Sequence, residues 1–155
     1  MIGRGPDLGD NFTTPVGLYD YARSYHDSAR ALEQARIRTM HRDASVWVLY
    51  FNAIELFLKT YLRLNGQTAA DIETGFRTDI ARLHERAAAL GCTFDEEDRI
   101  VLSLMDETHS VLRSCPADTR GRSMPTTLVL ERTATSLRAT VCTALREVTG
   151  ATVGV

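Results

Sequence analysis

Residues 44–64, ASVWVLYFNAIELFLKTYLRL, decide the fold of this protein. The polar side chains of this stretch recur at steps of three and four residues: Asn52, Glu55, Lys59 and Arg63. At about 100° per residue, these positions form one narrow stripe along a helix. Almost all other positions are apolar, and a helix that is apolar on most sides is buried on most sides. We therefore expect a central helix, which is surrounded by a bundle or also lines an interface between subunits.

The chain before this stretch predicts a first helix. Pro15 suits its start, because the N–H that proline lacks would have no partner there. Residues 1–14 are rich in Gly, Asp, Asn and Thr and are expected to form a mobile arm. The helix should extend to about residue 40, since apolar side chains recur along it at helical spacing: Leu18, Ala22, Tyr25, Ala29 and Leu32. Asp43 then resembles an N-cap for the central helix.

The chain after the central helix predicts four further helices, at 69–74, 79–90, 95–113 and 127–148. Thr68 with Asp71 resembles a capping box for the first of them, and Thr78 is expected to cap the second. Gly91 and Gly150 are expected to follow the ends of the second and the last helix. Acidic residues at 95–98 favour the positive end of a helix dipole. The last helix carries the cleanest apolar periodicity in the chain: Leu130, Ala134, Leu137, Val141, Ala144 and Val148.

The fold class follows from these patterns. No stretch alternates apolar and polar residues with period two, so no sheet is expected. A chain of 155 residues fits one domain. We predict an all-α, antiparallel bundle of four to five helices. The bundle domain should cover 15–149, between the arm at 1–14 and a frayed C-terminus at 150–155.

Composition argues against several classes of protein. The net charge is −2, whereas domains that grip nucleic acid usually carry a basic excess, so any such contact must be local. The three cysteines form no Cys-x-x-Cys pair, so neither a disulfide framework nor a zinc site is predicted. The longest apolar run contains several charged side chains, and the N-terminus has no apolar core. We expect a cytoplasmic protein without a membrane span, metal or cofactor.

Candidate catalytic residues are few. The sequence has no Gly-rich phosphate loop, no Gly-x-Ser-x-Gly and no His-Glu-x-x-His. His109 follows Asp106 by three residues and precedes Arg113 by four, so the three side chains are neighbours on a helix surface. This arrangement suits a general acid/base held by Asp106. It is also the pattern of an ordinary surface pair, which is the commoner case on helices.

Glu55 and Lys59 form a second candidate. Their spacing and order favour an ion pair along the helix, and on so apolar a helix the pair is expected to be partly buried. The structural interpretation is a stabilising pair. The functional interpretation is a pair that faces a cleft together with Arg113 or Asp79.

Two arginine clusters are candidates for contact with phosphate groups. One lies at the end of the first helix, and the other lies in the proline-flanked loop at 115–125: Arg36, Arg38 and Arg42, and Arg120 and Arg122. Cations at a helix C-terminus are also expected from the helix dipole alone.

The order of these features resembles the HEPN-like helical domains of bacteria and archaea, over most of residues 18–148. The shared elements are a helix with Tyr21 and Tyr25, the core segment AIELFLKTYL at 53–62 with its Glu-x-x-x-Lys pattern, TDIARL at 78–83, and RSCP at 113–116. Two positions depart from the family pattern. Thr78 stands where the family has His, and Ser114-Cys115 stands where it has Tyr.

The resemblance implies an antiparallel bundle that often forms a homodimer. It also implies a toxin–antitoxin or phage-defence context, with a partner such as a nucleotidyltransferase. Catalytic members are metal-independent ribonucleases with Arg, four to six residues and then His. Two pairs fit this spacing by count but lie elsewhere in the fold: Arg36 with His41, and Arg77 with His84. We therefore expect a non-catalytic member.

Three hypotheses follow. In the first, the chain is a non-catalytic HEPN-like homodimer that binds RNA or a protein partner. In the second, it is a metal-independent ribonuclease in which His109 and Arg113 act, or in their place Arg36 and His41. In the third, a small molecule binds in a central pocket faced by Glu55, Lys59 and Tyr50.

Overall fold

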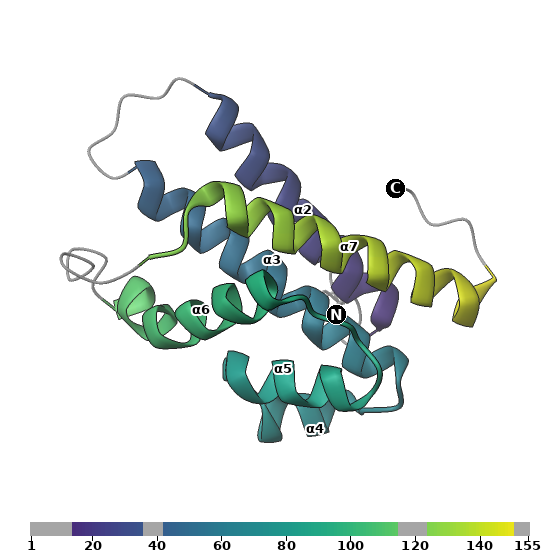
Figure 1. The fold of residues 1–155 in the computed structure, drawn as a ribbon. Coiled ribbons are helices and arrows are strands. Elements are labelled where there is room, and N and C mark those ends of the chain that lie inside the picture. The colour runs from purple at the N-terminus through teal and green to yellow at the C-terminus, as the bar shows by residue number, and fades with distance from the viewer. Residues whose placement is uncertain (1–13, 36–41, 115–123, 151–155) are drawn as a thin grey trace, which may run out of the picture.

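The computed structural model describes residues 14–35, 42–114 and 124–150, without the side chains of residues 42 and 109–114. These residues form six α-helices and no strand, which confirms the all-α prediction. They correspond to the six helical segments predicted along the chain, although the predicted bundle counted only four to five. Figure 1 shows the helices α2 (Pro15–Gln34), α3 (Arg42–Leu64), α4 (Ala69–Gly75), α5 (Ile80–Ala89), α6 (Glu96–Ser114) and α7 (Thr127–Thr149).

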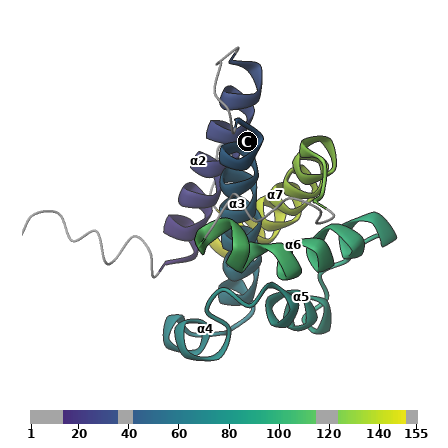
Figure 2. The ribbon, with the colours of Figure 1, turned by 90° about the vertical axis from the view of Figure 1, so that its left-hand side faces the viewer.

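The helix α3 is central, as its apolar sequence predicts. It packs against each of the other five helices. Figure 2 shows α2 and α7 on either side of it, with α4 and α5 together at one end of the molecule. Its largest buried side chains are Tyr50, Phe51, Ile54, Phe57, Leu58 and Leu62. The chain itself therefore covers the apolar sides of α3, and an interface between subunits is not needed to explain them.

The directions of the helices position the site described below. In Figure 1, α2 runs opposite to α3, and α6 runs opposite to α7. The helices α2 and α7 also pack against each other. The second half of α2 consequently lies beside the first half of α7, although these segments are more than 100 residues apart in the chain.

Several predicted helix ends are confirmed. The capping box of α4 is present, because Thr68 Oγ1 accepts from Asp71 N at 3.1 Å and Asp71 Oδ2 accepts from Thr68 N at 3.1 Å. Gly91 follows α5 with φ of 103°, and Gly150 follows α7 with φ of 62°. Glycine adopts such positive φ values without the steric cost that other residues meet.

The first helix differs from its prediction in length and in its buried face. It ends at Gln34 rather than near residue 40, because Ala35 is extended. Leu18, Ala22 and Ala29 are buried as predicted, but Tyr25 is exposed and the fully buried His26 takes its place. The spacing of four between Ala22 and His26 fits a helix face equally well, and our prediction wrongly preferred the aromatic residue to the histidine.

Three smaller predictions are wrong. Asp43 lies in the first turn of α3 rather than at its N-cap, since the helix begins one residue earlier. The N-cap of α5 is Asp79 and not Thr78, because the Asp79 carboxylate accepts from Arg82 N at 3.0 Å. Val148 on α7 is exposed, and Leu145 is buried in its place. The arm at 1–14 and the C-terminus at 150–155 lie outside the described residues, apart from Thr14 and Gly150.

Candidate functional site

Most of the predicted site residues have side chains outside the described part of the chain. They are Arg36, Arg38, Arg42, His109, Arg113, Arg120 and Arg122. Residues 109–114 continue α6. The proposed phosphate contacts of these arginines, and the acid–base role of His109, therefore stay predictions.

Glu55 and Lys59 form the predicted ion pair on α3. Lys59 Nζ lies 2.7 Å from Glu55 Oε1, and the side chains are 17% and 5% exposed respectively. The pair is thus partly buried, as its apolar helix predicts. Tyr50, on the same helix, donates to Glu33 Oε2 on α2. These contacts hold helices and side chains in place, which supports the structural interpretation.

Asp79 has a structural task at the start of α5. Its carboxylate caps the helix by accepting from Arg82 N. Asp106, on α6, accepts from Ala81 N at 3.2 Å and so fastens the same helix start to α6. Asp79 is exposed at this position, and its carboxylate is directed to the backbone of its own helix.

A buried histidine forms the centre of a polar cluster between α2 and α7. His26 Nε2 lies 3.4 Å from Glu131 Oε1, and His26 Nδ1 lies 3.3 Å from Arg138 Nη1. Because arginine can only donate, Nδ1 must accept. The proton of a neutral ring is then on Nε2, from which it is donated to Glu131. Both ring nitrogens are therefore used inside the protein.

The environment of His26 favours the neutral ring. The side chain has no exposed surface, and its ring lies against Tyr50 and Phe57. Burial, followed by the positive charge of Arg30, lowers the pKa of His26 below its usual value of 6.5. A second proton would sit on Nδ1 and face the Arg138 guanidinium, which agrees with the direction of the shift.

Two further ion pairs fix the arginines of this cluster. Arg30 donates from Nε to Glu131 Oε1 at 2.6 Å and from Nη2 to Thr135 Oγ1 at 3.1 Å. Arg138 donates from Nη1 to Asp27 Oδ1 at 2.7 Å. These contacts join α2 to α7 and hold both guanidinium groups in one orientation.

Beside this cluster, α2 and α7 form a groove of about 440 Å³, which we call the α2–α7 groove. Three arginines contribute to its walls, and none of the described residues in those walls is a carboxylate. The side chains that matter for its chemistry are Tyr19, Arg30, Arg138, Cys142, Thr143 and Arg146. The walls thus offer many hydrogen-bond donors and positive charge, which favours an anionic ligand.

Tyr19 is the unusual member of the groove. Its side chain is fully buried and its ring packs near Phe57. Its hydroxyl lies close to the Cys142 thiol and the Arg138 guanidinium but forms no hydrogen bond of good geometry with either. Burial, with Cys142 next, raises the pKa of Tyr19, so the hydroxyl keeps its proton and remains a donor at neutral pH. A buried donor without a strong acceptor costs stability, so an oxygen atom of a ligand would be favoured beside it.

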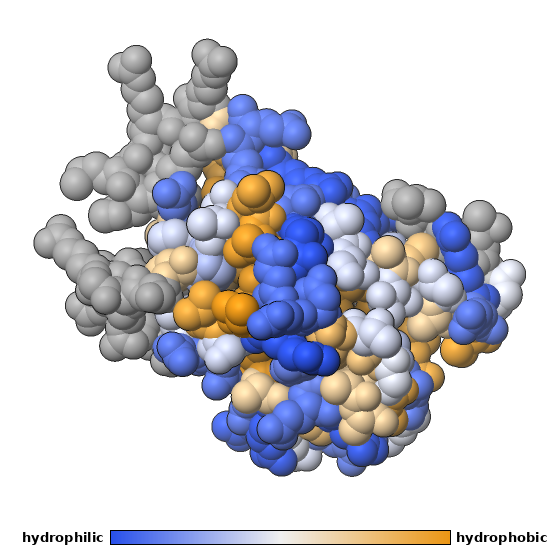
Figure 3. Space-filling view, viewed as in Figure 1, coloured by the Kyte–Doolittle hydropathy of each residue, from blue (hydrophilic) through white to orange (hydrophobic). Residues whose placement is uncertain are grey.

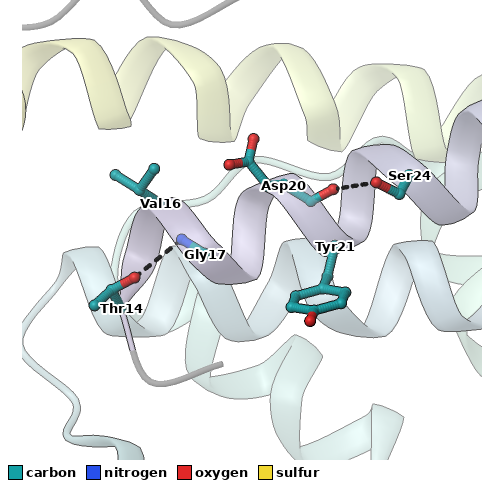
Figure 4. Close-up of a pocket in the computed structure, with 6 residues that line it drawn as sticks. All are labelled: Thr14, Val16, Gly17, Asp20, Tyr21 and Ser24. Atoms are coloured by element: carbon teal, nitrogen blue, oxygen red, sulfur yellow. Dashed lines mark hydrogen bonds between the residues drawn. The ribbon is translucent and has the colours of Figure 1, made fainter. Parts of the chain in front are cut away.

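Two other pockets lie elsewhere. One, of about 340 Å³, covers the first turns of α2, with Val16 and Asp20 on one side of the helix and Tyr21 on the other (Figure 4). The hydrogen bonds drawn there are local to that helix and its N-cap, from Gly17 N to Thr14 Oγ1 and from Ser24 Oγ to Asp20 O.

The other pocket, of about 230 Å³, lies between α5 and α6 and includes His84, Ser103 and Asp106. The His84 ring packs edge-on against the Phe94 ring, with 4.5 Å between the ring centroids. Burial, followed by the charge of Arg99, lowers the pKa of His84. None of the three pockets is lined by the Glu55–Lys59 pair, so they give no support to a small-molecule site built on that pair.

The molecular surface mixes polar and apolar regions. Figure 3 shows hydrophobic surface over α6 and the beginning of α7, bordered by hydrophilic residues. Among the exposed apolar side chains are Ile100 on α6 and Leu128 on α7. These side chains supply no hydrogen-bond donor or charge, so the chemistry of the α2–α7 groove is the more specific feature.

Sequence analysis missed the groove because its halves come from distant helices. Arg138 and His26 are 112 residues apart, and no local spacing relates them. One signal was present within α7, where Arg138, Cys142 and Arg146 follow one another at steps of four and so share a helix face.

Among the residues that the structure describes, no three His, Cys, Asp or Glu side chains gather as metal ligands would. None of the helices in the same ranges is long and apolar enough to cross a membrane. Comparisons with family models, with curated proteins and with solved structures gave no match. The function must therefore be argued from the residues of the groove.

Proposed function

We propose that this protein is a non-catalytic interaction module that binds RNA through the α2–α7 groove. The observation that supports it most is the convergence of Arg30, Arg138 and Arg146 on one groove whose described walls contain no carboxylate. RNA carries a negative charge at each phosphate, and guanidinium groups bind phosphate oxygens through parallel N–H donors. A local site of this kind is compatible with a net charge of −2.

The carboxylates next to the groove bind its arginines but leave some of the guanidinium N–H donors for a ligand. Asp27 and Glu131 pair with Arg138 and Arg30, which reduces the net positive charge. Arg138, however, uses only Nη1 in its hydrogen bonds with His26 and Asp27. Arg138 also lines the groove beside Tyr19, so the N–H groups that these two bonds do not use are placed where a phosphate in the groove can accept from them. Because the guanidinium is already oriented, less side-chain entropy is lost on binding.

The groove favours binding over catalysis. The histidine next to it, His26, has no exposed surface and uses both ring nitrogens in internal contacts. A general acid or base must come within hydrogen-bond reach of the substrate, and His26 does not. The ribonuclease alternative rests on His109 and Arg113, whose side chains lie outside the described residues.

The HEPN-like resemblance adds a homodimer to this proposal. The apolar character of α3 no longer argues for it, because the other helices of the same chain cover that helix. Solution scattering at micromolar concentration would test the dimer separately. A monomer would remove the dimer and leave RNA binding by the groove as a single-chain property.

The test is RNA binding measured by fluorescence anisotropy in EDTA, with a labelled single-stranded RNA at two salt concentrations. We expect Arg146→Gln to weaken binding and to reduce the slope of log affinity against log salt by roughly 1, as expected for one lost phosphate contact. Arg86→Gln is the matched control, since Arg86 is an exposed arginine on α5 that does not line the groove.

Three outcomes would overturn the proposal. The first is equal affinity and equal salt slope for the Arg146→Gln, Arg86→Gln and unchanged proteins. The second is cleavage of the RNA in EDTA that disappears in His109→Ala, which would favour the ribonuclease alternative. The third is binding of an acidic peptide with no binding of RNA, which would move the function to a protein partner.

A further inference from the structure

The donors of the α2–α7 groove are arranged around a small space. Arg138, Cys142 and Arg146 lie along one row of α7, and Thr143 lies in the neighbouring row. Tyr19 comes from the opposite wall, on α2, and both Cys142 and Arg138 lie close enough to its hydroxyl to influence its pKa. The hydroxyl therefore lies next to the Arg138 and Cys142 end of that row, in the same groove that Arg146 lines.

Tyr19 supplies the second observation that points to a ligand. Its hydroxyl is buried and protonated, and the acceptor close to it is the Cys142 thiol, whose sulfur accepts only weakly and does not form a hydrogen bond of good geometry with it. Buried polar groups in native proteins nearly always have a partner. Arg138 is also largely covered, with 14% of its side chain exposed. A ligand oxygen that binds Arg138 from the groove would enter next to the Tyr19 hydroxyl and could accept from it.

We propose that the α2–α7 groove binds a terminal phosphate monoester, and not a phosphodiester in the middle of a strand. The preference for a phosphate monoester is argued from the side chains of the groove. The identification of this monoester as the phosphorylated end of an RNA rests on the proposed function. The volume of about 440 Å³ falls in the range of sites that enclose one small ligand. A strand that passed through the groove would have to leave it at both ends.

The number of donors also favours a monoester. A phosphodiester offers two non-bridging oxygens and one negative charge. A terminal phosphate offers three oxygens and a charge of roughly −1.5 to −2 at neutral pH. Arg138, Arg146 and the Tyr19 hydroxyl can then each donate to a different oxygen, with Thr143 beside them. Bonds between charged donors and phosphate oxygens are among the stronger hydrogen bonds.

The experiment compares short RNAs of one sequence that differ only at their ends, in the full chain and in EDTA. One carries hydroxyl groups at both ends, one a 5′-phosphate and one a 3′-phosphate. A nucleoside monophosphate and inorganic phosphate serve as competitors. We expect at least one phosphorylated RNA to bind about tenfold more tightly than the hydroxyl-ended RNA.

Tyr19→Phe is the decisive variant, because it removes the hydroxyl and keeps the ring in the core. We expect it to weaken binding of the phosphorylated RNA several-fold more than binding of the hydroxyl-ended RNA, and so to abolish most of the preference for the phosphorylated end. Tyr50→Phe is the matched control, since Tyr50 is equally buried but donates to Glu33 instead of lining the groove. Thermal melting would show that both variants are folded.

The outcomes separate this inference from RNA binding itself. Equal affinity for phosphorylated and hydroxyl-ended RNA, or a preference that survives in Tyr19→Phe, would overturn the inference and leave RNA binding in place. Binding of the nucleoside monophosphate without binding of RNA, again lost in Tyr19→Phe, would support the phosphate site and overturn the proposed function. If a phosphoserine peptide bound and neither RNA nor the nucleoside monophosphate did, the inference that the phosphate belongs to a nucleotide would be overturned.

Discussion

Arg138 Nη1 donates to Nδ1 of the fully buried His26 across 3.3 Å, so a charged side chain of α7 fixes the neutral form of a histidine on α2. The opposite ring nitrogen faces Glu131 on the same helix as Arg138. One histidine thus joins two helices by accepting on one side and donating on the other. This relationship links the packing of α2 on α7 to the protonation of His26.

The first prediction is that the free energy of unfolding falls as the pH decreases below about 6.5. The pKa of His26 is lowered in the folded state by burial and by Arg30, so the unfolded chain binds the proton more readily. The stabilising contribution is complete above the unfolded pKa and is lost as the pH falls through the lowered folded pKa. Urea unfolding between about pH 7.5 and about pH 5 would measure it.

The variant that tests this is His26→Gln, which cannot take up the proton. It should be less stable than the unchanged protein at pH 7.5 but should lose less stability towards pH 5. His84→Gln is the comparison, because the pKa of His84 is lowered in the same direction but His84 lies between α5 and α6. If the free energy of unfolding of His26→Gln kept its full dependence on pH, and that of His84→Gln lost it, the effect would be assigned to His84 instead.

The second prediction concerns the Glu55–Lys59 pair. Both side chains are more than four-fifths buried, and removal of one partner leaves the other charge in a poorly solvated place. We expect Glu55→Gln and Lys59→Met each to lower the free energy of unfolding by about 2–3 kcal/mol. The double variant should lose clearly less than the sum, by about 1 kcal/mol or more. Additive losses in urea unfolding would mean that the two charges do not support each other.

The third prediction separates a structural from a functional Asp79. As the N-cap of α5, it should cost about 1 kcal/mol of stability when changed to Ala and almost nothing when changed to Asn, which also caps helices well. Neither change should alter RNA affinity. A loss of binding in Asp79→Asn, with stability intact, would return Asp79 to the list of functional residues.

The residues that were predicted correctly share one property, which is that their signal is local. The polar stripe of α3, the capping box at Thr68 and Asp71, and the glycine after α5 each depend on neighbours within about one turn of the chain. Thr78 and Asp79 show the limit of such signals. Both are good caps, and the sequence alone did not decide between them.

The candidate site could not be predicted in the same way. Tyr19, His26 and Arg138 meet only because α2 packs against α7, and that contact is set by the burial of many side chains at once. Periodicity counted Tyr25 as apolar and passed over His26, although the structure buries the histidine and exposes the tyrosine. A buried histidine needs a partner on another helix, and the sequence does not state which helix supplies it.

The last prediction uses two glycines with opposite expectations. Gly91 follows α5 with φ of 103°, where Cys92 N donates to Ala87 O and Gly91 N donates to Ala88 O, the pair of bonds that closes a helix C-terminus. The atom that a Cβ at Gly91 would meet first is Tyr61 Oη at 3.7 Å, an ordinary contact. The backbone angle, and not crowding, therefore makes Gly91→Ala unfavourable, by about 1–2 kcal/mol.

Gly75 is the matched position, because it ends α4 with no positive φ and no atom within 4 Å of an added Cβ. Gly75→Ala should stabilise the protein by about 0.5 kcal/mol, since alanine restricts the unfolded chain and suits a helix. Thermal melting of both variants would check the opposite signs. If Gly91→Ala were as stable as the unchanged protein, the bonds from Gly91 and Cys92 to the end of α5 would not require glycine.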